Sequence, residues 1–131
     1  MEGMVAKELQ AMKIEQAVTI IKVSDYLDYK KYFSDLYACM KENNTKYTYL
    51  RFAEDLGFNA TTAAHQIVRG HRPLSAKNAE RVVKALKLTG KEKKYFMSLV
   101  DFNNAKSVKS REERFETLVS LKQQTLKEPE E

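Results

Sequence analysis

The sequence predicts an all-α fold, a bundle of five to six helices preceded by an N-terminal arm. The chain has 131 residues, the usual size of one domain. It contains only 4 Gly and 2 Pro, so many short strands joined by tight turns are not expected, which argues against sandwiches and barrels. Apolar residues instead recur at intervals of three and four, the period of a buried helix face.

The arm is predicted at residues 1–23. Its apolar residues form two sets with helical spacing that do not share one stripe: Val5, Leu9, Met12 and Ile14, Val18, Ile21. An irregular helix is one interpretation, and a short strand at residues 18–23, where β-branched residues cluster, is the other. These side chains need burial either against the domain itself or against another chain. In the second case the arm is a candidate oligomerisation segment that would form a homodimer.

A helical domain is predicted at residues 24–126, followed by an acidic tail at 127–131 that we expect to fray. Its first helix has the apolar stripe of a buried face: Tyr29, Tyr32, Phe33, Leu36 and Met40. Ser24 and Asp28 are the two candidate N-caps of this helix.

Two short helices follow. The first begins after its cap Thr48 and ends at Gly57, and its predicted inward residues are Leu50, Ala53 and Leu56. Asn59 is predicted to cap the next helix, at residues 60–69, which ends at Gly70. Its inward side comprises Ala60, Ala63 or Ala64, Ile67 and Val68. The polar side chains left outside are Thr61, Thr62, His65, Gln66 and Arg69.

Three further helices complete the predicted bundle. Ser75 caps a helix whose apolar residues are Ala79, Val82, Val83, Leu86 and Leu88. Capping boxes, the S/T-x-x-E pattern, are predicted at Thr89 with Glu92 and at Ser110 with Glu113. The inward residues of the last two helices are Phe96, Leu99, Val100 and Asn103, then Phe115, Leu118, Val119 and Leu126.

Charge is distributed unevenly along the chain. The formal net charge is +5, but residues 41–94 hold twelve Lys and Arg against five Asp and Glu, a net charge of +7. The remaining residues therefore sum to −2. A basic middle between slightly acidic flanks is typical of a surface that binds a polyanion, and a solvated helical surface is the alternative reading.

The two short helices in this basic region, with a turn at residues 57–59 between them, match a helix-turn-helix, whose second helix lies in the major groove of DNA. The segments that carry the match are 50–58 (LRFAEDLGF), 67–72 (IVRGHR) and 74–75 (LS). They resemble the Cro/repressor-type, or Xre-like, DNA-binding domain.

A closer resemblance extends over residues 24–121, about three quarters of the chain. It rests on segments 25–33 (DYLDYKKYF), 52–53 (FA), 57–58 (GF), 70–72 (GHR), 74–75 (LS), 79–80 (AE), 85–88 (ALKL), Glu92, 95–96 (YF) and 102–106 (FNNAK). These look like the amino-terminal half of the paralogous regulator-like proteins expanded in Bdellovibrio and Fibrobacter. The resemblance implies a helix-turn-helix transcriptional regulator.

On this interpretation the partner is double-stranded DNA, and the site residues divide into two groups. Arg69 and Gln66 would bond guanine and adenine edges, Thr61 and Thr62 would touch a thymine methyl or a phosphate, and His65 would do either. The side chains expected along the phosphate backbone are Lys46, Thr48, Arg72, Ser75 and Lys77.

The alternative function is a protein-interaction or signalling adaptor that reuses the same scaffold without specific DNA binding. Its partner would be another protein, and the apolar residues of the arm favour it. We expect no enzyme, because no catalytic constellation or phosphate-binding loop is visible. We also expect no metal or other cofactor, because His65 and His71 have no nearby acidic or Cys partner.

Composition also bears on location. Cys39 is the single cysteine and cannot form an internal disulfide, which fits a reducing compartment. Glu2, Lys7 and Glu8 interrupt the region where a secretory signal would need an apolar run. No stretch approaches the length of a membrane span. We therefore expect a cytoplasmic protein with no membrane partner.

Overall fold

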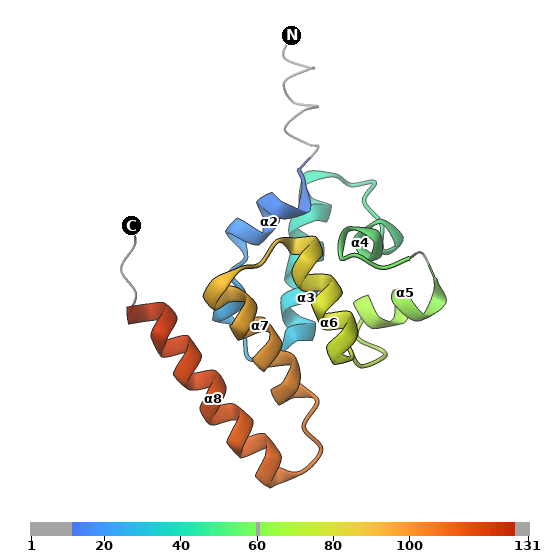
Figure 1. The fold of residues 1–131 in the computed structure, drawn as a ribbon. Helices are drawn as coiled ribbons and strands as arrows, with labels where there is room; N and C mark the ends of the chain where they lie inside the picture. Colours follow the sequence, from blue (N-terminus) through green and yellow to red (C-terminus); the bar gives the residue numbers. More distant parts are fainter. Residues whose placement is uncertain (1–11, 60, 128–131) are drawn as a thin grey trace.

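The computed structural model describes residues 12–59 and 61–127, and within these ranges the chain is all-helical (Figure 1). Seven α-helices and one 3₁₀ helix occur in the described residues, with no strand among them. They are α2 (Ile14–Ile20), η1 (Val23–Asp25), α3 (Tyr29–Asn43), α4 (Tyr49–Asp55), α5 (Thr62–Val68), α6 (Ala76–Leu86), α7 (Gly90–Asn103) and α8 (Val108–Lys127). The predicted all-α class is confirmed.

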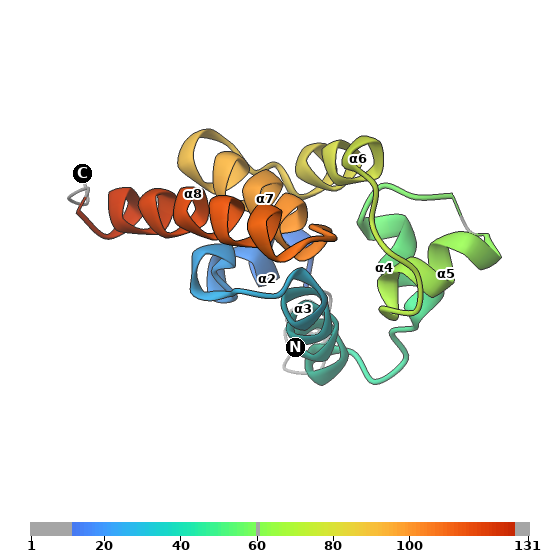
Figure 2. The same ribbon diagram turned by 90° about the horizontal axis from the view of Figure 1, so that it is seen from below.

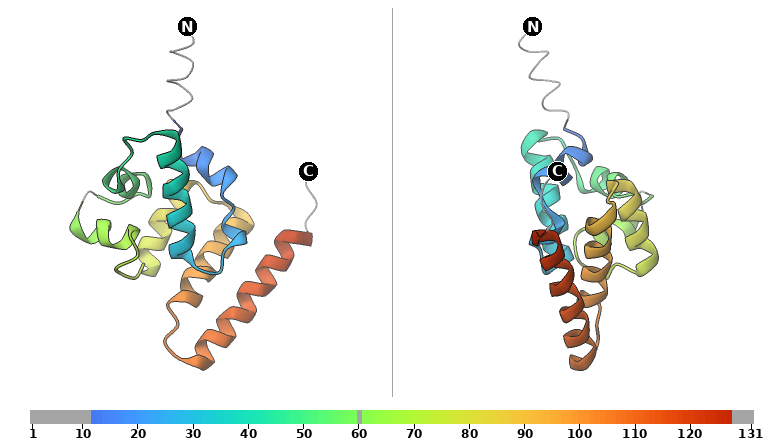
Figure 3. Two further views of the ribbon diagram at one scale, coloured as in Figure 1. Left: turned by 180° about the vertical axis from the view of Figure 1, so that it is seen from behind. Right: turned by 60° about the vertical axis from the view of Figure 1, so that its left-hand side comes forward.

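The centre of the fold is α3, which contacts α2, α5 and α7. Seen from behind, it runs down the middle of the molecule (Figure 3). Every residue of its predicted stripe is buried. Phe33, 1% exposed, contacts four other rings at centroid distances of 5.7–6.2 Å: Tyr29, Tyr32, Phe52 and Phe96. Three helices thus meet around one aromatic side chain.

The helices α4 and α5 lie at one side of the molecule and α8 at the other, as the view from below shows (Figure 2). The long helix α8 packs mainly on α7 and buries Leu118 completely. Its Lys122 Nζ also donates a hydrogen bond to the carbonyl oxygen of Ser24 at 2.8 Å. No helix in the described ranges has the length and apolar character needed to cross a bilayer.

Of the two interpretations of the arm, the strand at residues 18–23 is wrong, because α2 extends to Ile20 and η1 begins at Val23. In α2 the residues Ile14, Ala17 and Val18 are buried against the chain's own core, and the helix contacts α3 and α6. Glu15 also pairs with Lys87 at 3.3 Å. Helical backbone satisfies its own hydrogen bonds, whereas a lone strand beside helices would have no partner strand. Residues 1–11 of the predicted arm lie outside the described residues.

Three predicted helix caps are confirmed, two are wrong, and one is right in position only. Asp28, Thr48 and Ser75 accept hydrogen bonds from the backbone N–H groups two or three residues further on. The cap of α5 is Thr61, which accepts from Ala64 N at 3.1 Å, so Asn59 does not cap and α5 begins two residues later than predicted. Ser107, and not Ser110, caps α8. Thr89 precedes α7 without a side-chain cap bond.

Two predicted core residues, Leu50 and Phe115, are exposed, and two others, Asn103 and Val119, are only half-buried. The predicted inward side chains of Ala60 and Leu126 lie outside those that the structure describes. Leu50 is 49% exposed, because the inward stripe of α4 passes through Phe52, Ala53 and Leu56. Leu50 lies on the flank of that stripe. Phe115 is 39% exposed, and its ring packs at a tilted angle on the partly buried Phe102, at 5.4 Å between ring centroids.

Candidate nucleic-acid interface

The connection between α4 and α5 depends on a glycine. Gly57 has φ +94°, the left-handed region that favours glycine. A Cβ at this position would lie 3.1 Å from the carbonyl oxygen of Arg81 and 3.2 Å from Cβ of Ala85, both in α6. Gly57 therefore lets the end of α4 approach α6 closely.

The helix α5 rests on the domain through one narrow face. Ala64, Ile67 and Val68 are buried as predicted, and the helix contacts α3 and α4. The opposite side carries Thr62 and Arg69, both exposed, and the half-buried Gln66. Figure 1 shows α5 at the edge of the molecule. A row of polar side chains therefore faces outward from a peripheral helix.

Tyr49, at the start of α4, holds two of the predicted site residues. The guanidinium carbon of Arg69 lies 5.0 Å from the centre of its ring, and the His65 ring meets it edge-on at 6.0 Å. Behind it, Tyr37 of α3 stacks at 3.9 Å with an angle of 8° between the rings. The cation–π contact and the stack place Arg69 and His65 together over a fixed aromatic surface.

The sequence prediction did not include Tyr49 in the site. A signal for it exists, because Tyr49 lies three residues before Phe52 and so belongs to the same face of α4. Its position after the cap Thr48 places the ring at the surface end of that face, where it can pack inward on Tyr37 and outward under Arg69.

Two hydrogen bonds of Tyr47, which precedes α4, connect it to the last residue of α4 and to α3. The Tyr47 hydroxyl donates a hydrogen bond to Asp55 at 2.5 Å, and Lys41 Nζ donates to the Tyr47 carbonyl oxygen at 2.7 Å. Burial, followed by the hydrogen bond to the Asp55 carboxylate, raises the pKa of Tyr47 well above its ordinary value. The phenol therefore stays neutral and keeps donating to Asp55 throughout the physiological range.

Three predicted phosphate or base contacts are cap hydroxyls. Thr48, Thr61 and Ser75 accept backbone N–H groups at 3.1, 3.1 and 3.2 Å. A hydroxyl that accepts in this way still has its own O–H to donate. Thr61 consequently precedes α5 as its cap, whereas the prediction placed it on the outward side of the helix.

The predicted cations lie on separate connections and helices. Lys46 precedes α4, Arg72 lies between α5 and α6, and Lys77 lies in the first turn of α6; all three are exposed. Among the described residues, no side-chain hydrogen bond or ion pair joins any of these three to another site residue. Sequence reasoning missed Lys30, whose methylene groups lie beside Gly70 at the end of α5.

No group of three or more His, Cys, Asp or Glu side chains in the described part of the chain is arranged to hold a metal ion. Comparison of the chain with protein-family models, with curated proteins and with solved structures found no match.

Proposed function

We propose that this chain is a DNA-binding transcriptional regulator in which α4 and α5 act as a helix-turn-helix. In this proposal α5 enters the major groove and presents its outward row to base edges. The observation that carries the proposal is Arg69 on Tyr49: a peripheral helix with a polar outward face holds its longest side chain against a fixed ring. Such support lowers the entropy that Arg69 would lose on binding a base.

The outward row supplies the groups that read bases. Arg69 would donate two hydrogen bonds to a guanine, and Gln66 would pair with an adenine. Thr62 would touch a thymine methyl or a phosphate, and His65, partly covered by Tyr49, would make a flanking contact. The inward residues Ala64, Ile67 and Val68 would only hold the helix in place.

The flanking groups would position the protein on the backbone. Cap hydroxyls of Thr48, Thr61 and Ser75 have an O–H available for a phosphate, and Lys46, Arg72 and Lys77 supply positive charge. These contacts would follow no particular sequence. They would make binding depend steeply on salt, by about 0.9 log unit of affinity per log unit of salt for each neutralised phosphate.

The test is binding to a pool of random duplex DNA, followed by selection of preferred sequences from that pool. We expect micromolar affinity near 50 mM salt and a steep fall at higher salt. Arg69→Ala and Gln66→Ala should each weaken binding to the selected sequence by about 1 to 3 kcal/mol. Lys77→Ala should weaken all sequences alike and lower the salt slope by about one unit.

The matched control is Lys93→Ala, which removes one exposed charge from the first turn of α7. It should leave both the affinity and the preferred sequence almost unchanged. A flat salt response, or Arg69→Ala and Gln66→Ala variants that keep wild-type affinity and preference, would contradict the proposal and favour the protein-interaction adaptor.

A further inference from the structure

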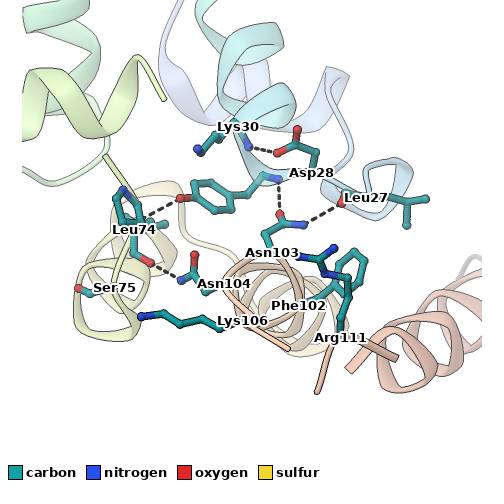
Figure 4. Close-up of a pocket in the computed structure, with 12 residues that line it drawn as sticks. Leu27, Asp28, Lys30, Leu74, Ser75, Phe102, Asn103, Asn104, Lys106 and Arg111 are labelled. Atoms are coloured by element: carbon teal, nitrogen blue, oxygen red, sulfur yellow. Dashed lines mark hydrogen bonds between the residues drawn. The ribbon is translucent and has the colours of Figure 1, made fainter. Parts of the chain in front are cut away.

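A pocket of about 880 Å³ is lined by none of the outward polar residues of α5, Thr62, Gln66 and Arg69 (Figure 4). It is bounded by the start of α3, the connection between α5 and α6, the end of α7 and the first turn of α8. Its volume falls within the range of small-molecule sites, which is about 300 to 1,000 Å³. The segments that form it come from four separate parts of the chain.

Hydrogen bonds fix the walls of this pocket in place. Asn103 Oδ1 accepts from Tyr29 N at 2.8 Å, and Asn103 Nδ2 donates to the Leu27 carbonyl at 3.0 Å. Leu74 N donates to the Tyr29 hydroxyl at 2.8 Å, and Asn104 Nδ2 donates to the Leu74 carbonyl at 2.7 Å. Tyr29 and Leu74 are buried. The network joins three walls, so the cavity is formed before any ligand binds.

Positive charge surrounds the pocket. Lys30, Lys106 and Arg111 line it, against the single carboxylate of Asp28, and Figure 4 shows the three cations on different sides. The Asp28 side chain accepts from Lys30 N as the cap of α3. None of the three cations forms an ion pair with a described residue. Because one carboxylate faces three cations, the pocket favours an anion.

The same pocket is apolar in part. Leu27 is 51% exposed, Phe102 is half-buried and Pro73 is exposed. Figure 4 shows the Leu27 and Phe102 side chains on the same side of the pocket as Arg111. Exposed apolar side chains next to unpaired cations fit a ligand that is itself divided into an apolar part and a charged part.

We propose that this pocket binds a small organic anion, a carboxylate or phosphate attached to an apolar body. The cations Lys30, Lys106 and Arg111 attract the anionic group, and Leu27 and Phe102 contact the apolar body. A DNA backbone would use the cations but not these apolar side chains. The pocket therefore fits a small molecule better than a duplex, and the site does not depend on the proposed function of α5.

The experiment uses octanoate and octyl phosphate as probes, with octanol as the uncharged compound of the same chain length. Binding to the full chain is followed by backbone and side-chain amide shifts in NMR spectra. We expect the shifts to concentrate at Leu74, Asn103 and Asn104. At least one of the two anions should bind about tenfold or more tightly than octanol, as one charge-assisted contact would give. The tighter anion assigns the head group.

Two double variants localise the binding. Lys106→Ala with Arg111→Ala should weaken the tighter anion about tenfold or more and leave octanol unchanged. Lys93→Ala with Lys94→Ala removes the same charge from exposed positions of α7 outside the pocket and should change neither. All four positions are polar surface residues, and thermal melts check that each variant folds.

Three results would overturn the proposal. The first is octanol binding as tightly as both anions, and the second is anion binding that survives in the Lys106 and Arg111 variant. The third is duplex DNA shifting the amides of Leu74, Asn103 and Asn104 when neither anion does, which would assign the three cations to a nucleic-acid surface.

Discussion

The centre of the molecule and the peripheral helix α5 are held in place by different kinds of contact. In the centre, rings from α3, α4 and α7 surround Phe33, and hydrogen bonds join distant segments, such as Tyr95 Oη to the Tyr26 carbonyl at 2.5 Å. At the edge, α5 is held by three small or medium-sized apolar side chains, Ala64, Ile67 and Val68, and by contacts of Arg69 and His65 with the Tyr49 ring.

This difference separates stability from the outward surface. The buried residues that hold the domain together are not the residues that α5 presents to solvent. Arg69→Ala removes a contact to the Tyr49 ring and Gln66 is half-buried, but neither side chain belongs to the core. Substitutions at these two positions should therefore change the outward surface and lower stability by no more than about 1 kcal/mol. Substitutions in the aromatic centre should do the reverse.

The largest loss of stability is expected from a cavity at the centre of the molecule. Phe33→Ala should lower the free energy of unfolding by about 3 to 5 kcal/mol, because it removes a fully buried ring and four ring contacts. Phe115→Ala removes the same ring where it is 39% exposed and should cost about 1 kcal/mol. Urea denaturation measures both. Equal losses would mean that the aromatic centre is not the main source of stability.

A smaller effect is expected at the turn that joins the two regions. Gly57→Ala should cost about 2 kcal/mol, because alanine must adopt φ near +94° and its Cβ meets the Arg81 carbonyl oxygen and the Ala85 Cβ. Gly90→Ala is the control, with φ +55° and no atom within 4 Å of the added Cβ. It should cost about 1 kcal/mol or less. If thermal or urea unfolding gives the same loss for both, the close approach of α4 to α6 does not matter.

A partly buried hydrogen bond of Tyr26 lies at the border between the aromatic centre and solvent. Its hydroxyl donates to Asp35 at 2.5 Å, and this bond, followed by Lys31, lowers the pKa of the Asp35 carboxyl. Tyr26→Phe keeps the ring and removes the donor. It should raise the Asp35 pKa and cost about 1 kcal/mol at neutral pH.

The lowered pKa of Asp35 determines how its contribution to the free energy of unfolding changes with pH. The contribution of the Asp35 carboxylate is present above the usual Asp pKa of 3.8 and is lost as pH falls through the lower native value. The stability difference between wild type and Tyr26→Phe should therefore shrink on acidification. Carboxyl NMR titration gives the pKa, and urea curves at each pH give the difference. A constant difference down to pH 2 would show that Asp35 is not the partner that matters.

The smallest expected effect compares two threonines before helices. Thr61→Ala removes the hydroxyl that caps α5 and should cost about 1 kcal/mol. Thr89 occupies the same position before α7 without a cap bond, so Thr89→Ala should change stability by less than about 0.5 kcal/mol. Thermal melts distinguish the two. The opposite ranking would mean that these hydroxyls contribute through something other than the cap.

Much of the fold could be predicted because local signals were unambiguous. The stripe of α3 repeats at helical intervals with aromatic residues at each step, and Gly57 and Gly70 end the two short helices at positive φ. The start of α5 could not be fixed in the same way. Asn59 and Thr61 are both good caps, and only the geometry of the turn selects Thr61.

The surface features depend on contacts between distant residues, which periodicity does not report. Tyr49 supports Arg69 twenty positions later, and Tyr29 bonds Leu74 and Asn103 from far along the chain. The pocket therefore had no signature in the sequence. The outward row of α5 did have one, since Thr62, Gln66 and Arg69 are polar on a helix whose other face is apolar.

The bond from Lys122 to the Ser24 carbonyl has a consequence for how the chain folds on a ribosome. Ser24 is translated 98 residues before the lysine that holds it. The carbonyl oxygens of Tyr26 and Leu27 likewise accept hydrogen bonds from residues much later in the chain, Tyr95 and Asn103. The segment at residues 24–27 therefore reaches its full set of native contacts only after α7 and this part of α8 have been synthesised, which makes its closure a late step of folding.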